Sequence, residues 1–105
     1  MRMKKILSAL LLTALPVSAH AQAIAMTQCQ SNVEKMWAGD GAYIWVHLAN
    51  GGSAIIAPND PNREAVIAMT ITAMTTERQV VIRYAADNVA CRSQGRTDLL
   101  GMYLL

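Results

Sequence analysis

The chain of 105 residues has few of the residue types from which redox, metal and phosphate sites are built. Its two cysteines lack the Cys-x-x-Cys spacing that lowers a thiol pKa in a redox pair. A metal site needs three or four converging ligands, and beyond the N-terminal segment only one histidine, His47, could join the cysteines. No glycine-rich turn closes with Gly-Lys-Ser/Thr, as a P-loop does. The sequence therefore predicts no metal site and no cofactor.

Long apolar runs are also absent. The run at residues 6–15 is too short for a membrane span, which needs roughly 20 apolar residues. Three basic residues precede this run and two small residues follow it: Arg2, Lys4 and Lys5, then Ala19 and Ala21. That arrangement is typical of a secretory signal peptide. We therefore expect residues 1–21 to be a signal peptide and residues 22–105 to be a single exported domain, periplasmic or secreted, with no membrane span.

Positive charge is scarce once this leader is set aside. The whole chain has a formal net charge of +2, but three of its nine basic residues lie in the leader. The predicted exported domain therefore has six basic residues and seven carboxylates, which gives it a net charge of about −1. Such a domain offers no strongly basic surface, and export separates it from nucleic acid. We expect no nucleic-acid partner.

Both cysteines, Cys29 and Cys91, fall in the predicted exported domain. A pair of cysteines in an exported domain of this size is most simply one disulfide. The bond would close a long loop, and chain-entropy arguments assign it roughly 4 kcal/mol of stabilisation. We therefore predict a disulfide between Cys29 and Cys91.

The spacing of apolar residues predicts strands in the first half of the domain. Residues 43–48 alternate between two faces, and the Asn-Gly-Gly sequence that follows is typical of a hairpin turn. We predict a strand at residues 43–48 with antiparallel partners at residues 32–37 and 53–57. Together they form a three-stranded meander.

A helix is predicted over residues 61–76, with Asp60 as its N-cap and Pro61 in its first turn, where the missing N–H costs nothing. Residues 67–73 also alternate as a strand would, but a strand of about fourteen residues is uncommon, so length favours the helix. Strands at residues 80–85 and 99–105 complete the order β-β-β-α-β-β. This is the order of the OB-fold, so we expect a mainly β domain with one helix: a five-stranded OB-fold barrel with one disulfide.

The second half of the chain adds a more specific likeness. It contains DPNRE at residues 60–64, TTERQVVIRY at residues 75–84 and LGMYLL at residues 100–105. With the leader, the element order and cysteines at positions matched by Cys29 and Cys91, the chain resembles the B subunits of bacterial AB toxins of the cholera and subtilase-cytotoxin type. The chain is shorter than these proteins and poorer in aromatic residues, and none of their glycan-binding motifs can be placed on its residues.

The resemblance implies an assembly and a class of ligand. Toxin B subunits of this type form rings of five, in which helices line the centre and strand edges pair between neighbours. They bind cell-surface glycans and accompany a catalytic A subunit. By this resemblance we expect a homo-oligomer, with a pentamer as the implied form, a glycan ligand and an A subunit as partner.

The strand at residues 43–48 carries the candidate ligand-binding residues. Tyr43, Trp45 and His47 share one face of it. Flat rings present apolar faces to sugar C–H groups, while the indole, phenol and imidazole supply hydrogen bonds. We predict a saccharide platform here, extended by Trp37. The alternative is that these amphipathic rings cover the barrel exterior or a subunit interface.

The predicted helix is apolar on more than one side, which is typical of a helix that is deeply buried or packed against a partner. In so small a domain the second option favours a homo-oligomer. We place the interface at four residues of the helix: Ala65, Ala68, Met69 and Thr72.

The last loop contains Arg92, Arg96 and Asp98. Either it is a solvated loop with an Arg96–Asp98 contact, or its arginines grip an acidic sugar through their planar guanidinium groups.

Two classes of function therefore compete. The leading hypothesis is an exported, non-enzymatic domain that resembles toxin B subunits, oligomerises and binds glycans. The alternative is a monomeric periplasmic OB-like domain that binds another envelope protein, in which case the apolar side of the helix is buried within the monomer. A small enzyme or inhibitor is a third option, but His47 has no evident nucleophile or carboxylate partner and no catalytic residue can be assigned.

Overall fold

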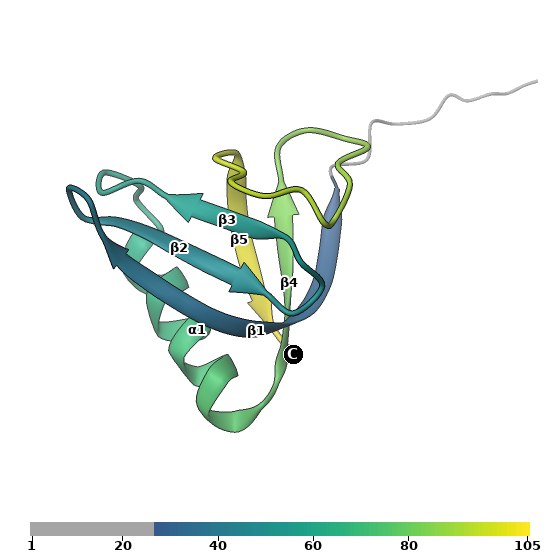
Figure 1. Ribbon diagram of the computed structural model, residues 1–105, viewed down its shortest axis with the longest axis horizontal. Helices are drawn as coiled ribbons and strands as arrows, with labels where there is room; N and C mark the ends of the chain where they lie inside the picture. Colours follow the sequence, from purple (N-terminus) through teal and green to yellow (C-terminus); the bar gives the residue numbers. More distant parts are fainter. Residues whose placement is uncertain (1–26) are drawn as a thin grey trace, which may run out of the picture.

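The computed structural model describes residues 27–105, and the predicted signal peptide, residues 1–21, lies outside the described residues. The fold is mainly β, with five strands and one helix in the predicted order (Figure 1). The elements are β1 (Gln28–Gly39), β2 (Tyr43–Leu48), β3 (Ser53–Ile56), α1 (Arg63–Thr76), β4 (Gln79–Tyr84) and β5 (Leu99–Leu104). No helix within residues 27–105 is long and apolar enough to cross a membrane.

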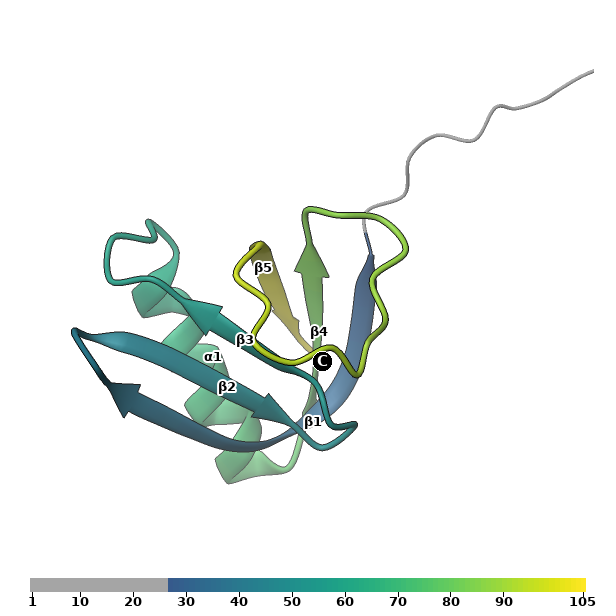
Figure 2. The same cartoon turned by 45° about the horizontal axis from the view of Figure 1, so that its top comes forward.

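All five strands form one antiparallel sheet in the order β3-β2-β1-β4-β5. The long strand β1 pairs with β4 through its first half and with β2 through its second half, and the register shifts between Val33 and Lys35. A bulge of this kind bends a strand and increases its twist. The bend at β1 therefore divides the sheet into two halves that face different directions (Figures 1 and 2).

The predicted closed barrel is not seen, because the sheet stays open between β3 and β5. Beside β3 the chain before β5 forms one parallel bridge, between Ala54 and Arg96. Two residues further along, the carbonyl of Asp98 accepts a hydrogen bond from the N–H of Ala85. The chain thus turns towards β4 before a longer β3–β5 pairing can form.

The core lies inside the bend of the sheet and is covered by α1, which contacts β1, β4 and β5. Alternate residues of the strands point into it, as expected for a sheet with one buried face. On the helix, the buried residues follow a helical spacing. Buried side chains include Ile44, Val46 and Leu48 of β2, Val66, Thr70 and Ala73 of α1, and Val80, Ile82 and Tyr84 of β4.

Two elements begin two or more residues away from their predicted starts. The helix begins at Arg63 with Asn62 as its N-cap, and not at Asp60 and Pro61. The Asp60 carboxylate instead accepts a hydrogen bond from the N–H of Asn62, 2.8 Å away, in a turn that precedes the helix. β1 also starts earlier than predicted, at Gln28, because its first half is held by pairing with β4.

The predicted disulfide is confirmed. Cys29 and Cys91 are bonded, with an S–S distance of 2.03 Å and Cα atoms 5.5 Å apart. Cys29 is a buried residue of β1, whereas Cys91 belongs to the connection between β4 and β5. The bond therefore fastens this long connection to the core.

Candidate functional site

Four predicted ligand-binding residues lie together on the outer side of the β1–β2 pair, and we call them the aromatic face: Trp37, Tyr43, Trp45 and His47. Trp37 lies directly opposite Trp45, and Tyr43 lies opposite Gly39. The intervening residues of β2 are buried in the core, so these four side chains point away from it. Trp37 and Tyr43 are 44% and 42% exposed. The structure thus brings the predicted residues together on an accessible surface.

The rings of the aromatic face are ordered by local contacts. Trp45 and His47 stack with ring centroids 5.9 Å apart and planes at 19°. The Trp37 indole lies over Gly39, where a Cβ atom would come within 2.8 Å of the ring. Gly39 therefore makes room for Trp37 at the end of β1.

Sequence reasoning missed the residue that completes this surface. Ile55 of β3 lies opposite Trp45, on the same side of the sheet. A Cβ atom on Gly95 would lie 3.9 Å from both Ile55 and the Trp45 indole, so the β4–β5 connection passes beside the aromatic face. Ile55 could have been found from the alternation of β3, but Gly95 could not, because its position depends on tertiary contacts.

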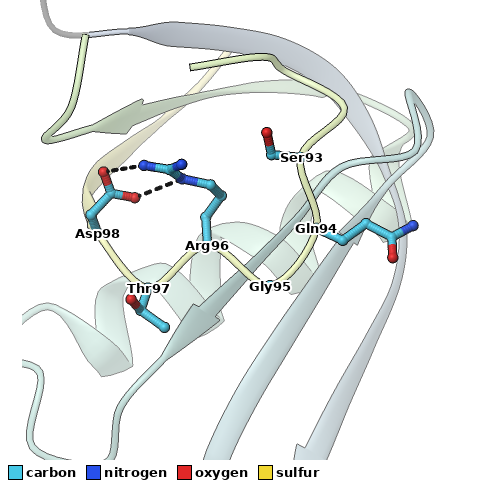
Figure 3. A pocket seen from close by; sticks show the side chains of 6 residues that line it. All are labelled: Ser93, Gln94, Gly95, Arg96, Thr97 and Asp98. Atoms are coloured by element: carbon cyan, nitrogen blue, oxygen red, sulfur yellow. Dashed lines mark hydrogen bonds and ion pairs between the residues drawn. The ribbon is translucent and has the colours of Figure 1, made fainter. Parts of the chain in front are cut away.

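A cavity lies in that connection, and we call it the loop hollow (Figure 3). Its volume is about 380 Å³, and it is lined by six consecutive residues: Ser93, Gln94, Gly95, Arg96, Thr97 and Asp98. Figure 3 shows the chain curving around the hollow, with Arg96 reaching across to Asp98. The lining contains hydroxyl, amide and charged groups and no large apolar side chain.

Hydrogen bonds hold the loop hollow against β3. The N–H of Ser53 donates to the carbonyl of Ser93 (3.1 Å), and the N–H of Arg96 donates to the carbonyl of Ser53 (3.1 Å). The N–H of Ile55 donates to the carbonyl of Arg96 (2.7 Å), and the Ser53 hydroxyl accepts from the N–H of Gly95 (2.7 Å). The loop therefore occupies the outer edge of β3, close to the aromatic face.

The predicted Arg96–Asp98 contact is confirmed. The Arg96 Nε and Nη2 atoms donate to the two carboxylate oxygens of Asp98 at 3.0 and 2.7 Å. These hydrogen bonds are the main reason that the pKa of Asp98 is lowered, and the N–H of Ala86 lowers it further. The same contact raises the pKa of Arg96. The Arg96 guanidinium and the Asp98 carboxylate therefore stabilise each other in their charged forms.

A buried tyrosine lies beside this ion pair. The Arg96 guanidinium carbon is 5.5 Å from the centre of the Tyr84 ring, within range of a cation–π contact. Burial raises the pKa of Tyr84, an effect that Arg96 partly offsets. The Tyr84 hydroxyl has no hydrogen-bond partner among residues 27–105. The ring thus serves as an apolar support for Arg96 and the loop.

The predicted interface residues of α1 differ in exposure, and one of them, Met69, packs against the core. Ala65 and Ala68 are exposed and Met69 and Thr72 are half-buried, while Ile71 beside them is 44% exposed. The exposed helix surface has few hydrogen-bonding groups to offer, because its threonine hydroxyls donate to carbonyls one turn back. These bonds join Thr72 to Ala68, Thr75 to Ile71 and Thr76 to Thr72.

A second apolar surface, on β5, lies next to the exposed side of α1. β5 pairs only with β4 among the described strands, so its other edge has no strand partner, and the Leu100 carbonyl accepts a hydrogen bond from the Asn62 amide at 3.3 Å. A groove of about 170 Å³ separates this edge from α1 and is lined in part by Ala65, Met69 and Met102. Leu100 and Leu105, at the two ends of β5, are both about half exposed.

The chemistry available at these surfaces is stacking, hydrogen bonding and apolar contact. Within residues 27–105 no three His, Cys, Asp or Glu side chains converge as metal ligands would. His47 is stacked on Trp45 and lies opposite Lys35 across the strand pair.

Comparisons with protein families, curated proteins and solved structures found no match. A function for this chain must therefore be inferred from its own residues.

Proposed function

We propose that the chain is an exported, non-enzymatic binding domain, similar to toxin B subunits, which self-associates and binds cell-surface glycans at the aromatic face. The single observation that carries the ligand proposal is the cross-strand arrangement of Trp37 and Trp45, with Tyr43 and His47 beside them. An exposed surface of rings with polar edges suits a saccharide, whose C–H groups stack while its hydroxyls form hydrogen bonds.

The fold proposed is an OB-fold with an incompletely closed barrel. The element order, the bent β1 shared between the two halves of the sheet and the parallel Ala54–Arg96 bridge all support it. Oligonucleotide and oligosaccharide ligands of this fold bind near the middle strands and the loops beside them. The aromatic face occupies that position.

Export to the periplasm or beyond the cell is proposed from the N-terminal segment, and the Cys29–Cys91 disulfide supports it. Structural disulfides persist in oxidising compartments and are rare in the cytosol.

Self-association is supported by the surfaces of α1 and β5. The exposed side of α1 carries Ala68, Ile71 and threonine methyl groups, and the two charged residues of the helix, Arg63 and Glu64, both lie in its first turn. An apolar helix surface of this kind usually packs against a partner. The open edge of β5 offers backbone groups to a neighbouring strand. A catalytic A subunit remains part of the proposal through the resemblance alone.

The alternative is a monomeric periplasmic domain that binds another envelope protein. It requires the apolar side of α1 to be buried within the monomer, whereas Ala68 and Ile71 are exposed. This exposure favours the oligomer.

A glycan array tests the ligand proposal. The protein lacking residues 1–21 is applied as wild type and as Trp45→Ala, with Tyr103→Ala as the matched control, since Tyr103 is an exposed aromatic residue of β5 outside the aromatic face. We expect wild type and Tyr103→Ala to bind the same glycans and Trp45→Ala to lose them. An array on which wild type binds nothing would exclude glycan binding, and equal binding by all three proteins would place the site elsewhere.

A further inference from the structure

The aromatic face and the loop hollow meet at Gly95. The backbone of Gly95 borders both, because a Cβ atom there would contact the Trp45 indole and Ile55 at 3.9 Å. Gly95 has a positive φ of 69°, which a glycine adopts without strain. Gly95 itself therefore adds no side chain at the boundary that a ligand stacked on Trp45 would cross to reach the hollow.

The two parts are also fixed relative to each other. Three backbone hydrogen bonds join the loop to β3, and β3 pairs in turn with β2, which carries Trp45. The disulfide anchors the same connection to β1 at Cys91. A surface that is ordered before the ligand arrives loses less conformational entropy on binding.

The charges of the hollow cancel. Two guanidinium nitrogens of Arg96 bind the Asp98 carboxylate, which also accepts the N–H of Ala86 at 3.0 Å. Among the six residues that line the hollow, Arg96 is the only cation, and its guanidinium is already paired with Asp98. The exposed Arg92 directly precedes the hollow but is not part of its lining. An acidic group placed there would meet the Asp98 carboxylate, and like charges in contact are unfavourable.

The remaining lining groups suit hydroxyls. Ser93 and Thr97 carry hydroxyl groups, which can both donate and accept a hydrogen bond. The Gln94 amide donates to the carbonyl of Gly51 at 3.4 Å, and its oxygen can accept. The Thr97 side chain is exposed and therefore accessible. A neutral ligand with several hydroxyl groups matches this set.

From these observations we infer that the protein binds a neutral oligosaccharide, with one sugar unit stacked on Trp45 and a neighbouring unit held by hydrogen bonds in the loop hollow. The inference rests on the proposed glycan-binding function and deepens it in two respects. It adds Ser93 and Thr97 to the site, and it selects neutral glycans over sialylated ones.

The test uses an array of neutral glycans and their sialylated counterparts with the protein lacking residues 1–21. Four proteins are compared with wild type: Trp45→Ala, Ser93→Ala with Thr97→Val, Thr97→Val alone, and Thr75→Val. The last is the matched control, because Thr75 is an exposed threonine of α1 whose hydroxyl is bonded within the helix. Circular dichroism and urea unfolding establish that each variant is folded.

We expect wild type to bind neutral glycans at least about tenfold more tightly than the sialylated forms. The Ser93→Ala, Thr97→Val variant should bind about tenfold more weakly, since each lost hydrogen bond costs a few-fold, and Thr97→Val alone should fall in between. Thr75→Val should bind as wild type.

Three results would overturn the inference, and they are distinguishable. Equal or tighter binding of sialylated glycans would refute the neutral ligand. Wild-type affinity in the Ser93→Ala, Thr97→Val protein, with loss of binding in Trp45→Ala, would remove the loop hollow from the site and leave the aromatic face intact. No binding of any glycan by wild type would refute the proposed function itself.

Discussion

The Cys29–Cys91 disulfide should account for much of the stability of this domain. The two cysteines are 62 residues apart, and closing a loop of that length in the unfolded chain corresponds to about 4 kcal/mol. A domain of about 80 residues has a total unfolding free energy of roughly 4–12 kcal/mol. Loss of the cross-link should therefore lower the melting temperature by about 15–30 °C, and bring the domain close to the limit of stability.

The measurement is urea unfolding followed by circular dichroism, on wild type, on Cys29→Ala with Cys91→Ala, and on reduced wild type. Reduced wild type is the control because it keeps both side chains, whereas truncation of the buried Cys29 adds a packing loss. Both cross-link-free proteins should lose about 4 kcal/mol, the alanine variant slightly more. A loss below about 1 kcal/mol in reduced wild type would refute the reasoning, since the loop would then be constrained by residual structure in the unfolded chain.

Three further predictions concern single residues. The folded-state pKa of Asp98 lies below its ordinary value of 3.8, so its ion pair stabilises the fold above about pH 4, and this contribution disappears as the pH falls through the lowered pKa. The difference in urea midpoint between wild type and Asp98→Asn should therefore shrink from pH 6 to pH 3. A constant difference would contradict this. Gly39→Ala should displace the Trp37 indole, which lies 2.8 Å from the new Cβ, and change the tryptophan fluorescence; an unchanged spectrum would show that the ring has room. Ile71→Asp should lower the oligomer mass measured by light scattering after size exclusion, while Ala90→Asp, an exposed loop residue, should not; a monomeric wild type at tens of micromolar would exclude self-association.

The sequence predicted the fold most accurately where a strand carries its own pattern. β2 was predicted within its observed bounds, because its residues alternate between the core and the outer side. The first half of β1 has no such pattern, since its inward residues are Cys29 and Ser31 and its outward residues are polar. That segment becomes a strand through its pairing with β4. Such long-range pairing cannot be predicted from the local sequence pattern.

The candidate site could likewise be predicted only where a strand carries its own alternating pattern. Alternation was enough to place Tyr43, Trp45 and His47 on one face, and the neighbouring strand added Trp37. The loop hollow could not be predicted in this way. It exists because the backbone of Ser53 and Ile55 binds a loop some forty residues further along the chain, and because the loop folds around the Arg96–Asp98 pair.

The attachment of the loop also limits how copies of this chain can join by strand pairing. Among the described strands the sheet ends in β3 and β5, and the outer edge of β5 pairs with no other strand. At β3 the outward N–H and carbonyl of Ser53 and the N–H of Ile55 are already bonded to the loop. A ring in which β3 of one copy pairs with β5 of the next must first break these three hydrogen bonds, at a net cost of about 3 kcal/mol. At β5 only the Leu100 carbonyl accepts a side-chain hydrogen bond among the described residues, from the Asn62 amide at 3.3 Å. A contact that uses the β5 edge together with the outer side of α1 therefore breaks fewer hydrogen bonds, and it is the less costly route to an assembly.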